Sequence, residues 1–341
     1  MAAMTRGRTD ADGLVGDMTV KYYTQRAGAG LLLTESIRIS EEATGSPLTP
    51  GIFTDQQIEA WKKVTTAVHD QGGVIVAQLW HTGRIGHSID RNGKLPLAPS
   101  PLAIRGMQHF TSQGRKDYEI PQEMTIPEIK QTINDFGQAA KNAIAAGFDG
   151  VQLHAANGYL PNQFLAESAN QRTDEYGGSI ANKARFIVEV MQELISAVGG
   201  EKVGIKISPF HAYGDMVLDD PAATYTYLIE KLNEMDFTYV EIMRRYPSFL
   251  SPENHAAQDE IEFFGNKIRQ TVIANAGYDK ASAEAELQKG IAKLISFGKL
   301  YIANPDLPKR FEKNAALSEP DRATMYGGGK QGYIDYPLWQ E

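Results

Sequence analysis

The chain has 341 residues, no cysteine and a formal net charge of −8. This length suits one barrel-sized domain, and the lack of cysteine excludes disulfides and thiolate metal sites. The acidic balance argues against nucleic-acid or acidic-membrane partners, because neutralising phosphates needs a basic surface. No apolar run is long enough to span a bilayer, and the start MAAMTRGRTDADG lacks the apolar core of a signal peptide. We therefore expect a cytoplasmic protein.

Short aliphatic runs recur along the chain, and each precedes a longer amphipathic segment. The runs are apolar on both faces, as the strands of a covered parallel sheet are. MAAMT at the N-terminus is the stub of a further strand. In chain order the plain strands are LLLTE (31–35), VIVAQLW (74–80), GVQLH (150–154), VGIKIS (203–208), YVEIM (239–243), VIANA (272–276) and LISFG (294–298).

The segments between these runs have the spacing of amphipathic helices. Several end at glycine, and one has Pro127 in its first turn, which is where helices tolerate proline. The predicted helical segments are DQQIEAWKKVTTAVHDQGG (55–73), IPEIKQTINDFGQAAKNAIAAGFDG (126–150), KARFIVEVMQELISAVGG (183–200), DPAATYTYLIEKLNEMDF (220–237) and ASAEAELQKG (281–290).

Regular alternation of strands and helices indicates a parallel sheet. Eight such units in a chain of this size favour a closed (β/α)8 TIM barrel, which we expect to be a single domain over residues 1–341. An open doubly wound sheet is the alternative. No Gly-x-Gly-x-x-Gly follows the first strand, which weakens a dinucleotide-binding interpretation.

Two long stretches without clear periodicity, about 81–125 and 244–262, each follow a strand. Loops after barrel strands lie on the catalytic face, so we expect lids or pocket walls there. Disordered surface insertions are the alternative.

Polar side chains stand where the run at 150–154 ends. His154 and Asn157 are three residues apart and can direct two N–H donors at one oxygen that gains negative charge. Tyr159 stays protonated at neutral pH and can supply a proton to a nearby carbon. The alternative is a structural histidine followed by an Asn157-Gly158 turn. A metal site is not expected, because no further ligand lies at helical spacing.

Other strand ends carry candidate binding residues. The backbone of Gly277 and Gly298, with Lys299, resembles the phosphate cradle after strands seven and eight of many barrels, although turn glycines are the alternative. Lys206 lies in an apolar strand and needs a partner, either a bound anion or electron-rich ring, or a neighbouring acid such as Glu241. Trp80, judged alone, is more typical of a core than of a substrate wall.

Taken together, the segments resemble the old yellow enzyme family of FMN-dependent ene-reductases, in order, from Ala2 to about Pro337. HAANGYL followed by NQRTDEYGGS is the most specific part of the resemblance. The other matching segments include AAMTRGR, YYTQRAGAGLLLTE, QLWHTGR, LPLAPS, IKISP, IANAGYD, FGKLYIANPDLPKRF and YGGGKQGYIDYP.

The resemblance implies FMN at the mouth of the barrel and assigns residues to it. Thr5 and Gln78 would bond the pyrimidine edge, and Lys206 would lie near flavin N1 and O2. Ala3 and Met4 would line the ring. The phosphate would be held by Ala276, Gly277, Gly298 and Lys299. His154 and Asn157 would bind the substrate oxygen, Tyr159 would be the proton donor, and Trp80 and Tyr326 would shape the cavity.

The implied activity is ping-pong reduction of activated C=C bonds, with NADPH or NADH as the hydride donor, by a monomer or homodimer. Three alternatives stay open. The same site could reduce nitrate esters or nitroaromatics. The chain could be a non-catalytic flavin-binding barrel. An isomerase or aldolase would instead use Lys206 as a Schiff-base lysine.

The chain departs from the family pattern at several positions. The family usually has about one more strand and hairpin before AAMTRGR, so the resemblance implies a shortened first strand and makes FMN retention a property to measure. Lys206 and Lys299 replace arginines, which keeps charge but loses the two-donor fork. Ala3 replaces a proline. Ala276 replaces a glycine, which is tolerable only if its φ is below zero, where alanine is unstrained.

Overall fold

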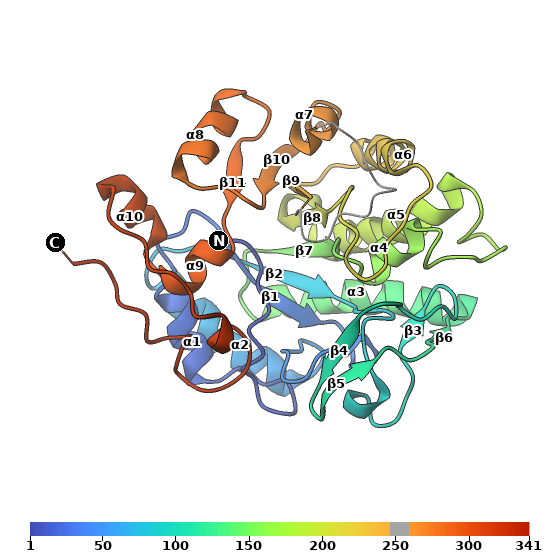
Figure 1. The fold of residues 1–341 in the computed structure, drawn as a ribbon, viewed down its shortest axis with the longest axis horizontal. Helices are drawn as coiled ribbons and strands as arrows, with labels where there is room; N and C mark the ends of the chain where they lie inside the picture. Colours follow the sequence, from blue (N-terminus) through green and yellow to red (C-terminus); the bar gives the residue numbers. More distant parts are fainter. Residues whose placement is uncertain (246–258, 341) are drawn as a thin grey trace.

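The computed structural model describes residues 1–245 and 259–340 and shows a curled parallel sheet wrapped by helices (Figure 1). The strand order is β1-β2-β7-β8-β9-β10-β11, and neighbouring strands pair in parallel. Every predicted plain strand is confirmed. Their bounds are β1 Leu32–Arg38, β2 Ile75–Trp80, β7 Gly150–Ala155, β8 Val203–Ile207, β9 Tyr239–Met243, β10 Thr271–Asn275 and β11 Leu294–Ser296.

The N-terminal residues join the two edge strands of this sheet. Ala2 N donates to Phe297 O, just beyond β11, at 3.0 Å, and Leu33 N of β1 donates to Met1 O at 3.0 Å. The predicted stub therefore occupies the place of an eighth strand, although residues 1–16 form no regular strand. The fold is an α/β TIM barrel, and the open-sheet alternative is wrong.

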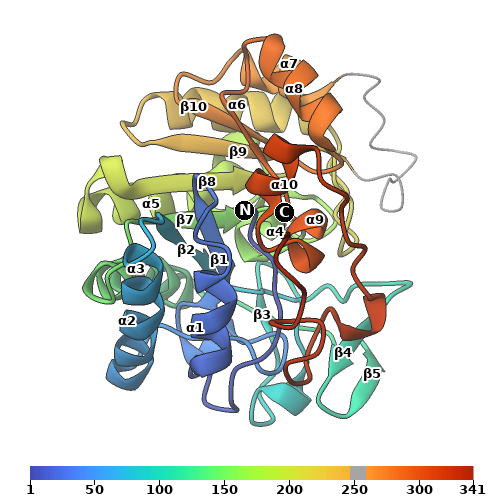
Figure 2. The ribbon, with the colours of Figure 1, turned by 90° about the vertical axis from the view of Figure 1, so that its left-hand side faces the viewer.

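Helices follow the strands and cover the outside of the sheet (Figures 1 and 2). The predicted segments correspond to α2 Asp55–His69, α3 Ile126–Ala145, α5 Ile180–Val198, α6 Pro221–Asn233 and α8 Lys280–Gln288. The sequence analysis missed α1 Asp17–Thr24, α4 Leu160–Leu165, α7 Glu260–Gly265, α9 Lys299–Ala303 and α10 Leu307–Lys313. None of the helices in the described ranges is long and apolar enough to cross a membrane.

The helix starts show why these segments fold locally. Thr54 and Thr125 each form a capping box, in which the threonine side chain and the N3 side chain satisfy each other's backbone N–H. Pro127 lies in the first turn of α3, as the sequence predicts. These caps fix where α2 and α3 begin after their preceding loops.

Side chains alternate between the outside and the inside of the barrel along each strand. The outward residues pack with the helices in the main core. The inward residues at Leu33, Val76, Tyr239 and Ile273 form a separate apolar cluster. Two positions further along β2, β9 and β10 stand Gln78, Glu241 and Asn275, so a polar layer lies above the apolar one.

The segment 81–125 is folded, so the alternative of a disordered insertion is wrong for it. It contains β3 Leu97–Ala98 paired with β6 Gln122–Glu123, and a hairpin of β4 Gln108–Thr111 and β5 Gly114–Asp117. The hairpin and the C-terminal segment lie on the same side of the sheet in Figure 2. Most of the segment 244–262 lies outside the described residues.

Candidate active site

The turn after β7 brings the predicted catalytic residues together. Asn157 and Gly158 have φ values of 58° and 76°, a left-handed conformation that asparagine and glycine tolerate. A Cβ on Gly158 would lie 2.5 Å from Tyr213 O, so the turn requires glycine there. The turn returns Tyr159 against its own strand, with its ring centroid 4.9 Å from that of His154 and 5.0 Å from that of Trp80.

Hydrogen bonds from neighbouring elements fix this turn. Asn157 N donates to Ser208 Oγ at 2.9 Å, beyond the end of β8, and Gly158 N donates to Asn162 Oδ1 at 2.9 Å. Gln163 Nε2 donates to Gly158 O at 2.7 Å and to Thr82 O at 3.0 Å. The positions of the catalytic candidates are therefore set before any ligand binds.

Burial determines the protonation states of the two titratable candidates. The pKa of His154 is held well below its usual value by burial and, to a smaller extent, by the nearby Lys206 ammonium. Burial raises the pKa of Tyr159 well above its usual value, with smaller contributions from neighbouring tyrosines. At neutral pH the histidine is neutral with one N–H, and the tyrosine carries its proton.

Three polar atoms around this turn are buried without a hydrogen-bond partner among the residues that the structure describes. They are His154 Nδ1, Asn157 Oδ1 and Trp80 Nε1. Buried polar atoms in folded proteins are nearly always paired, so unpaired ones grouped together indicate a binding site. The Asn157 carboxamide offers one acceptor and one donor group, and a half-turn of the amide exchanges them.

Lys206 and Gln78 lie inside the barrel with spare hydrogen-bonding capacity. Lys206 Nζ donates to Asn275 Oδ1 at 3.0 Å and lies 3.4 Å from Glu241 Oε1. Its partner within the protein is therefore the neighbouring acid Glu241, one of the two partners expected from the sequence. Gln78 accepts from Ser36 Oγ at 2.6 Å and donates to Gln152 Oε1 at 2.7 Å. An ammonium has three N–H groups, and a carboxamide has two N–H groups and two oxygen lone pairs. Both side chains can therefore still bond a ligand.

The two predicted phosphate turns lie side by side, because Asn275 and Ser296 pair at the ends of β10 and β11. Ala276 and Gly277 have φ values of 78° and 77°. The condition of a negative φ at Ala276 is therefore not met, and the alanine is held in a conformation that its Cβ disfavours. A strained residue of this kind is typical of a ligand-binding turn.

Arg244 was missed by the sequence analysis. Its guanidinium donates to Ala276 O through Nε at 3.1 Å and through Nη2 at 2.9 Å. Nη2 also lies 3.4 Å from where a Cβ of Gly277 would stand. The only sequence signal was an arginine directly after the strand at 239–243. The structure adds it to the candidates at the phosphate turn.

The remaining predicted cofactor residues border the same turns. A Cβ on Gly298 would lie 3.6 Å from Met4 Sδ, and Ala3 packs against the inner apolar cluster. Thr5 follows directly and is partly buried. Lys299 begins α9, is largely exposed, and has its Nζ 3.7 Å from Glu319 Oε2.

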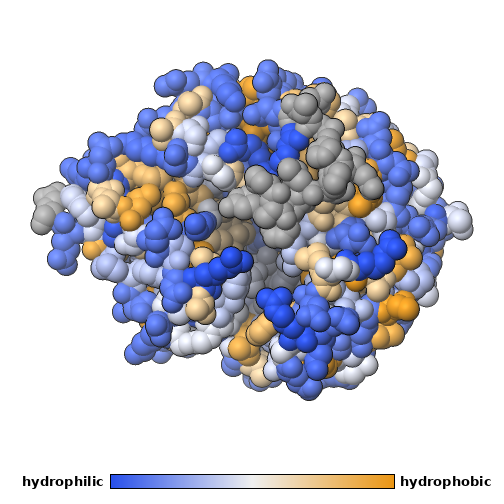
Figure 3. Space-filling model, viewed as in Figure 1, coloured by the Kyte–Doolittle hydropathy of each residue, from blue (hydrophilic) through white to orange (hydrophobic). Residues whose placement is uncertain are grey.

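Tyr326 is exposed, in a segment that the N-terminal residues hold in place. Arg6 Nε donates to Met325 O at 2.9 Å, and Gly327 N donates to Arg6 O at 2.8 Å. Tyr326 also contributes to the raised pKa of Tyr159. The molecular face is hollowed near its centre, between this C-terminal segment and the β4–β5 hairpin (Figure 3).

The catalytic candidates and the phosphate turns occupy the same end of the barrel. His154 pairs in register with Lys206, and Lys206 bonds Asn275, the residue directly before Ala276. A continuous path therefore runs from the β7 turn to the phosphate turn along the carboxyl ends of β7, β8 and β10. Unpaired polar atoms at one end of this path, and the turn of strained Ala276 and Gly277 at the other, fit a flat ring with a phosphate tail.

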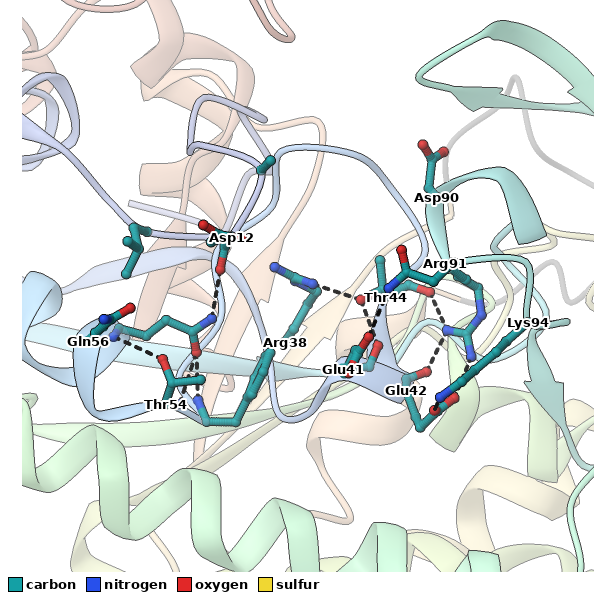
Figure 4. A pocket seen from close by; sticks show the side chains of 15 residues that line it. Asp12, Arg38, Glu41, Glu42, Thr44, Thr54, Gln56, Asp90, Arg91 and Lys94 are labelled. Atoms are coloured by element: carbon teal, nitrogen blue, oxygen red, sulfur yellow. Dashed lines mark hydrogen bonds and ion pairs between the residues drawn. The ribbon is translucent and has the colours of Figure 1, made fainter.

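A separate pocket of about 510 Å³ lies beyond the end of β1 and contains none of these residues (Figure 4). Its charged groups largely satisfy one another. Arg91 Nη2 lies 2.9 Å from Glu42 Oε2, and Lys94 Nζ lies 2.7 Å from Glu42 Oε1. Arg38 Nη1 donates to Thr44 Oγ1 at 2.7 Å. These internal pairs hold the loop after β1 in place.

Comparison with known proteins agrees with this geometry. The model of the NADH:flavin oxidoreductase / NADH oxidase family matches residues 1–318. The chain belongs to this family. It is therefore a flavin-dependent oxidoreductase that uses FMN, and the old yellow enzymes are its structural neighbours.

Individual relatives cover almost the whole chain. A putative 12-oxophytodienoate reductase 5 from Oryza sativa subsp. japonica is 42% identical, over 94% of this chain and 85% of its own. A probable flavin mononucleotide-dependent alkene reductase from Leishmania infantum is 39% identical, over 99% of this chain and 92% of its own. The old yellow enzyme homologue of Zymomonas mobilis superposes with a TM-score of 0.95 at 36% identity, covering 99% and 95% of the two chains.

Proposed function

We propose that the protein reduces the activated C=C bond of α,β-unsaturated carbonyl compounds, with NADPH or NADH as the hydride donor and two half-reactions in turn. The observation that carries this proposal is the group of unpaired buried atoms on His154 and Asn157 beside protonated Tyr159. The name of the Leishmania infantum relative, an alkene reductase, supports the same reaction class.

The cofactor residues divide by chemistry. Thr5 and Gln78 would bond the pyrimidine edge of FMN, and Lys206 would place positive charge on its N1 and O2 side. The phosphate would be held by Ala276, Gly277, Gly298 and Lys299, to which we add Arg244. Ala3 and Met4 would line the ring. FMN held there would supply hydride transfer between the nicotinamide and the β-carbon of the substrate.

The protein side chains aim and polarise the substrate. The N–H groups of His154 and Asn157 hold the carbonyl oxygen and stabilise the negative charge that develops on it, which is worth on the order of 3 kcal/mol of barrier per donor. Tyr159 gives its proton to the α-carbon. Trp80 and Tyr326 border the substrate cavity. The segment 81–125 forms part of its wall on the carboxyl-end face of the barrel.

The decisive experiment follows the visible spectrum of the purified protein under anaerobic conditions. We expect a yellow protein that bleaches with NADPH or NADH and recovers its colour when 2-cyclohexenone is added. A protein that binds no added FMN, or whose reduced form does not respond to any enone, would contradict the proposal.

A nitro group offers the same oxygens to His154 and Asn157, so nitrate-ester or nitroaromatic reduction is the competing activity of this site. Steady-state kcat/KM values for 2-cyclohexenone and for a nitrate ester rank the two. We expect the enone to be favoured, because only its reduction uses the Tyr159 proton on carbon. A higher kcat/KM for the nitrate ester, unaffected by Tyr159→Phe, would reverse the order.

A further inference from the structure

Each strand of the sheet contributes one buried polar side chain to the layer above the inner apolar cluster. Gln152 and Glu241 have no exposed surface at all. We call this set the polar ring. Its members are Ser36, Gln78, Gln152, Lys206, Glu241, Asn275 and Ser296, from β1, β2, β7, β8, β9, β10 and β11 in that order.

One arm of the ring runs from β1 to β9 through two glutamines. Ser36 Oγ donates to Gln78 Oε1 at 2.6 Å. Gln78 Nε2 donates to Gln152 Oε1 at 2.7 Å, and Gln152 Nε2 donates to Glu241 Oε2 at 2.8 Å. Every hydrogen in this arm points toward Glu241.

The second arm reaches Glu241 from the other direction. Lys206 Nζ donates to Asn275 Oδ1 at 3.0 Å, and Asn275 Nδ2 donates to Ser296 Oγ at 2.7 Å. Ser296 Oγ then donates to Glu241 Oε1 at 2.6 Å, and Lys206 also lies 3.4 Å from that oxygen. Glu241 is therefore where both arms end.

The chemistry of the members explains this common direction. A carboxylate only accepts hydrogen bonds and an ammonium only donates them, whereas a carboxamide can turn over and exchange the two roles. Because Glu241 accepts, Gln152 must face it with its NH2 group, and Gln78 must then face Gln152 with its own NH2 group. Glu241 thus sets the orientation of the Gln78 amide through Gln152, two hydrogen bonds away.

We propose that Glu241 is a positioning residue for the flavin: it fixes the orientation of the Gln78 amide and the place of the Lys206 ammonium, and its charge offsets that of Lys206. This rests on the proposed function, in which those two side chains face the pyrimidine edge of FMN. Glu241 reaches that edge only through its partners, since its own two oxygens are already bonded inside the ring.

The charge of Glu241 has a measurable consequence for FMN. A buried positive charge beside N1 and O2 favours the reduced, electron-rich flavin, and a negative charge 3.4 Å from Lys206 Nζ weakens that preference. Replacing the carboxylate by a neutral group of the same shape leaves Lys206 uncompensated. Reduced FMN should then be favoured over oxidised FMN more strongly than in the wild type.

The first test is Glu241→Gln, with the midpoint potential of bound FMN measured by anaerobic spectroelectrochemical titration. We expect the preference for reduced over oxidised FMN to rise roughly tenfold, which corresponds to about 30 mV for a two-electron couple. Glu241→Asp, which restores the charge, should bring the potential back toward the wild-type value. Glu59→Gln makes the same charge change on the exposed surface of α2 and should not move it.

The second test separates orientation from charge. Gln152→Met cuts the arm between Glu241 and Gln78 but leaves the Lys206–Glu241 pair in place. Titration of the apoprotein with FMN, followed by quenching of flavin fluorescence, should show affinity lower by roughly tenfold, because one buried bond to Gln78 is lost. The midpoint potential should stay at the wild-type value. If Glu241→Gln does not fold, Gln152→Met tests the proposal by itself.

The outcomes distinguish the two proposals. A wild-type protein that binds no FMN or reduces no enone overturns the proposed function. A wild-type protein that does both, while Glu241→Gln keeps the wild-type potential or Gln152→Met keeps the wild-type FMN affinity, overturns only the assignment of Glu241.

Discussion

Two turns of this barrel share left-handed φ values but have very different side chains. After β7, Asn157 and Gly158 have φ values of 58° and 76°, and after β10, Ala276 and Gly277 have values of 78° and 77°. Asparagine tolerates this conformation and brings a carboxamide to the site, whereas alanine brings only strain. In the proposed function, the first turn presents side chains to the substrate, and the second presents its backbone to the phosphate of FMN.

The variant with the largest expected effect tests the proposed chemistry of the turn after β7. Tyr159→Phe keeps the aromatic packing against His154 and Trp80 but removes the proposed proton donor. We expect reoxidation of the reduced enzyme by 2-cyclohexenone to slow by about 10²–10⁴-fold, while bleaching by NADPH changes little. Stopped-flow measurement of each half-reaction separates the two.

The matched control is Tyr227→Phe, which removes a tyrosine hydroxyl from the partly buried face of α6. It should leave both half-reactions at the wild-type rates. Equal slowing of bleaching and reoxidation in Tyr159→Phe would instead indicate a general disturbance of the flavin site.

Asn157→Gly separates the side chain of the β7 turn from its backbone. Glycine adopts φ of 58° without strain, so stability should change little, while kcat/KM for the enone should fall by about 10²–10³-fold through loss of one oxygen donor. Asn157→Ala should lose the same activity and also unfold more easily. If Asn157→Gly kept full activity, the carboxamide would have no role in binding the substrate oxygen.

The pH dependence of stability should report the buried histidines near the β7 turn. Burial lowers the pKa of His81 to about 3 and that of His154 well below its usual value. Both are neutral when folded, so the unfolded chain binds more protons below pH ~6.5 and stability falls as pH decreases from there. Denaturant unfolding at pH 7.5 and 5.5 should differ by about 1.4 kcal/mol per buried histidine.

A control variant isolates this effect from other titrating groups. His81→Gln removes one buried imidazole, and the difference in unfolding free energy between the two pH values should shrink. An unchanged difference would mean that His81 takes up its proton as readily in the folded protein as in the unfolded chain.

Ala276→Gly has the smallest expected effect and tests the backbone strain in the turn after β10. Removing a Cβ held at φ of 78° should raise the free energy of unfolding by about 0.5–1 kcal/mol, after the greater entropy of glycine in the unfolded chain is counted. Thermal unfolding of the apoprotein measures it. Ala274→Gly, in the buried interior of β10, should have the opposite sign.

The strands and longer helices could be predicted from the sequence because their apolar periodicity is long and regular. Short helices such as α4 and α9 could not, because their few residues follow from packing after a strand rather than from a repeating pattern. The residues of the β7 turn were found because their types are chemically distinctive. Arg244 was missed, since an arginine in a long loop looks like a solvated charge until the chain folds it onto Ala276.

The polar ring shows a different limit. Glu241 was recognised only as a partner for Lys206, because an inward-pointing polar residue on one strand says nothing about its neighbours. Barrel closure brings one such residue from each strand into a single network. The positive φ of Ala276 could not be predicted for a related reason: alanine gives no local signal for a left-handed turn that the ends of two strands impose.

The central claim is that the β7 turn and the phosphate turn serve one flavin. It is tested most directly by following the flavin absorbance of the wild type and of His154→Ala/Asn157→Ala through anaerobic addition of NADPH and then 2-cyclohexenone. The account predicts that both proteins are yellow, and that the wild type recovers its colour far faster than the double variant. Equal recovery of colour by the two proteins, or failure of either protein to bind FMN, would contradict it.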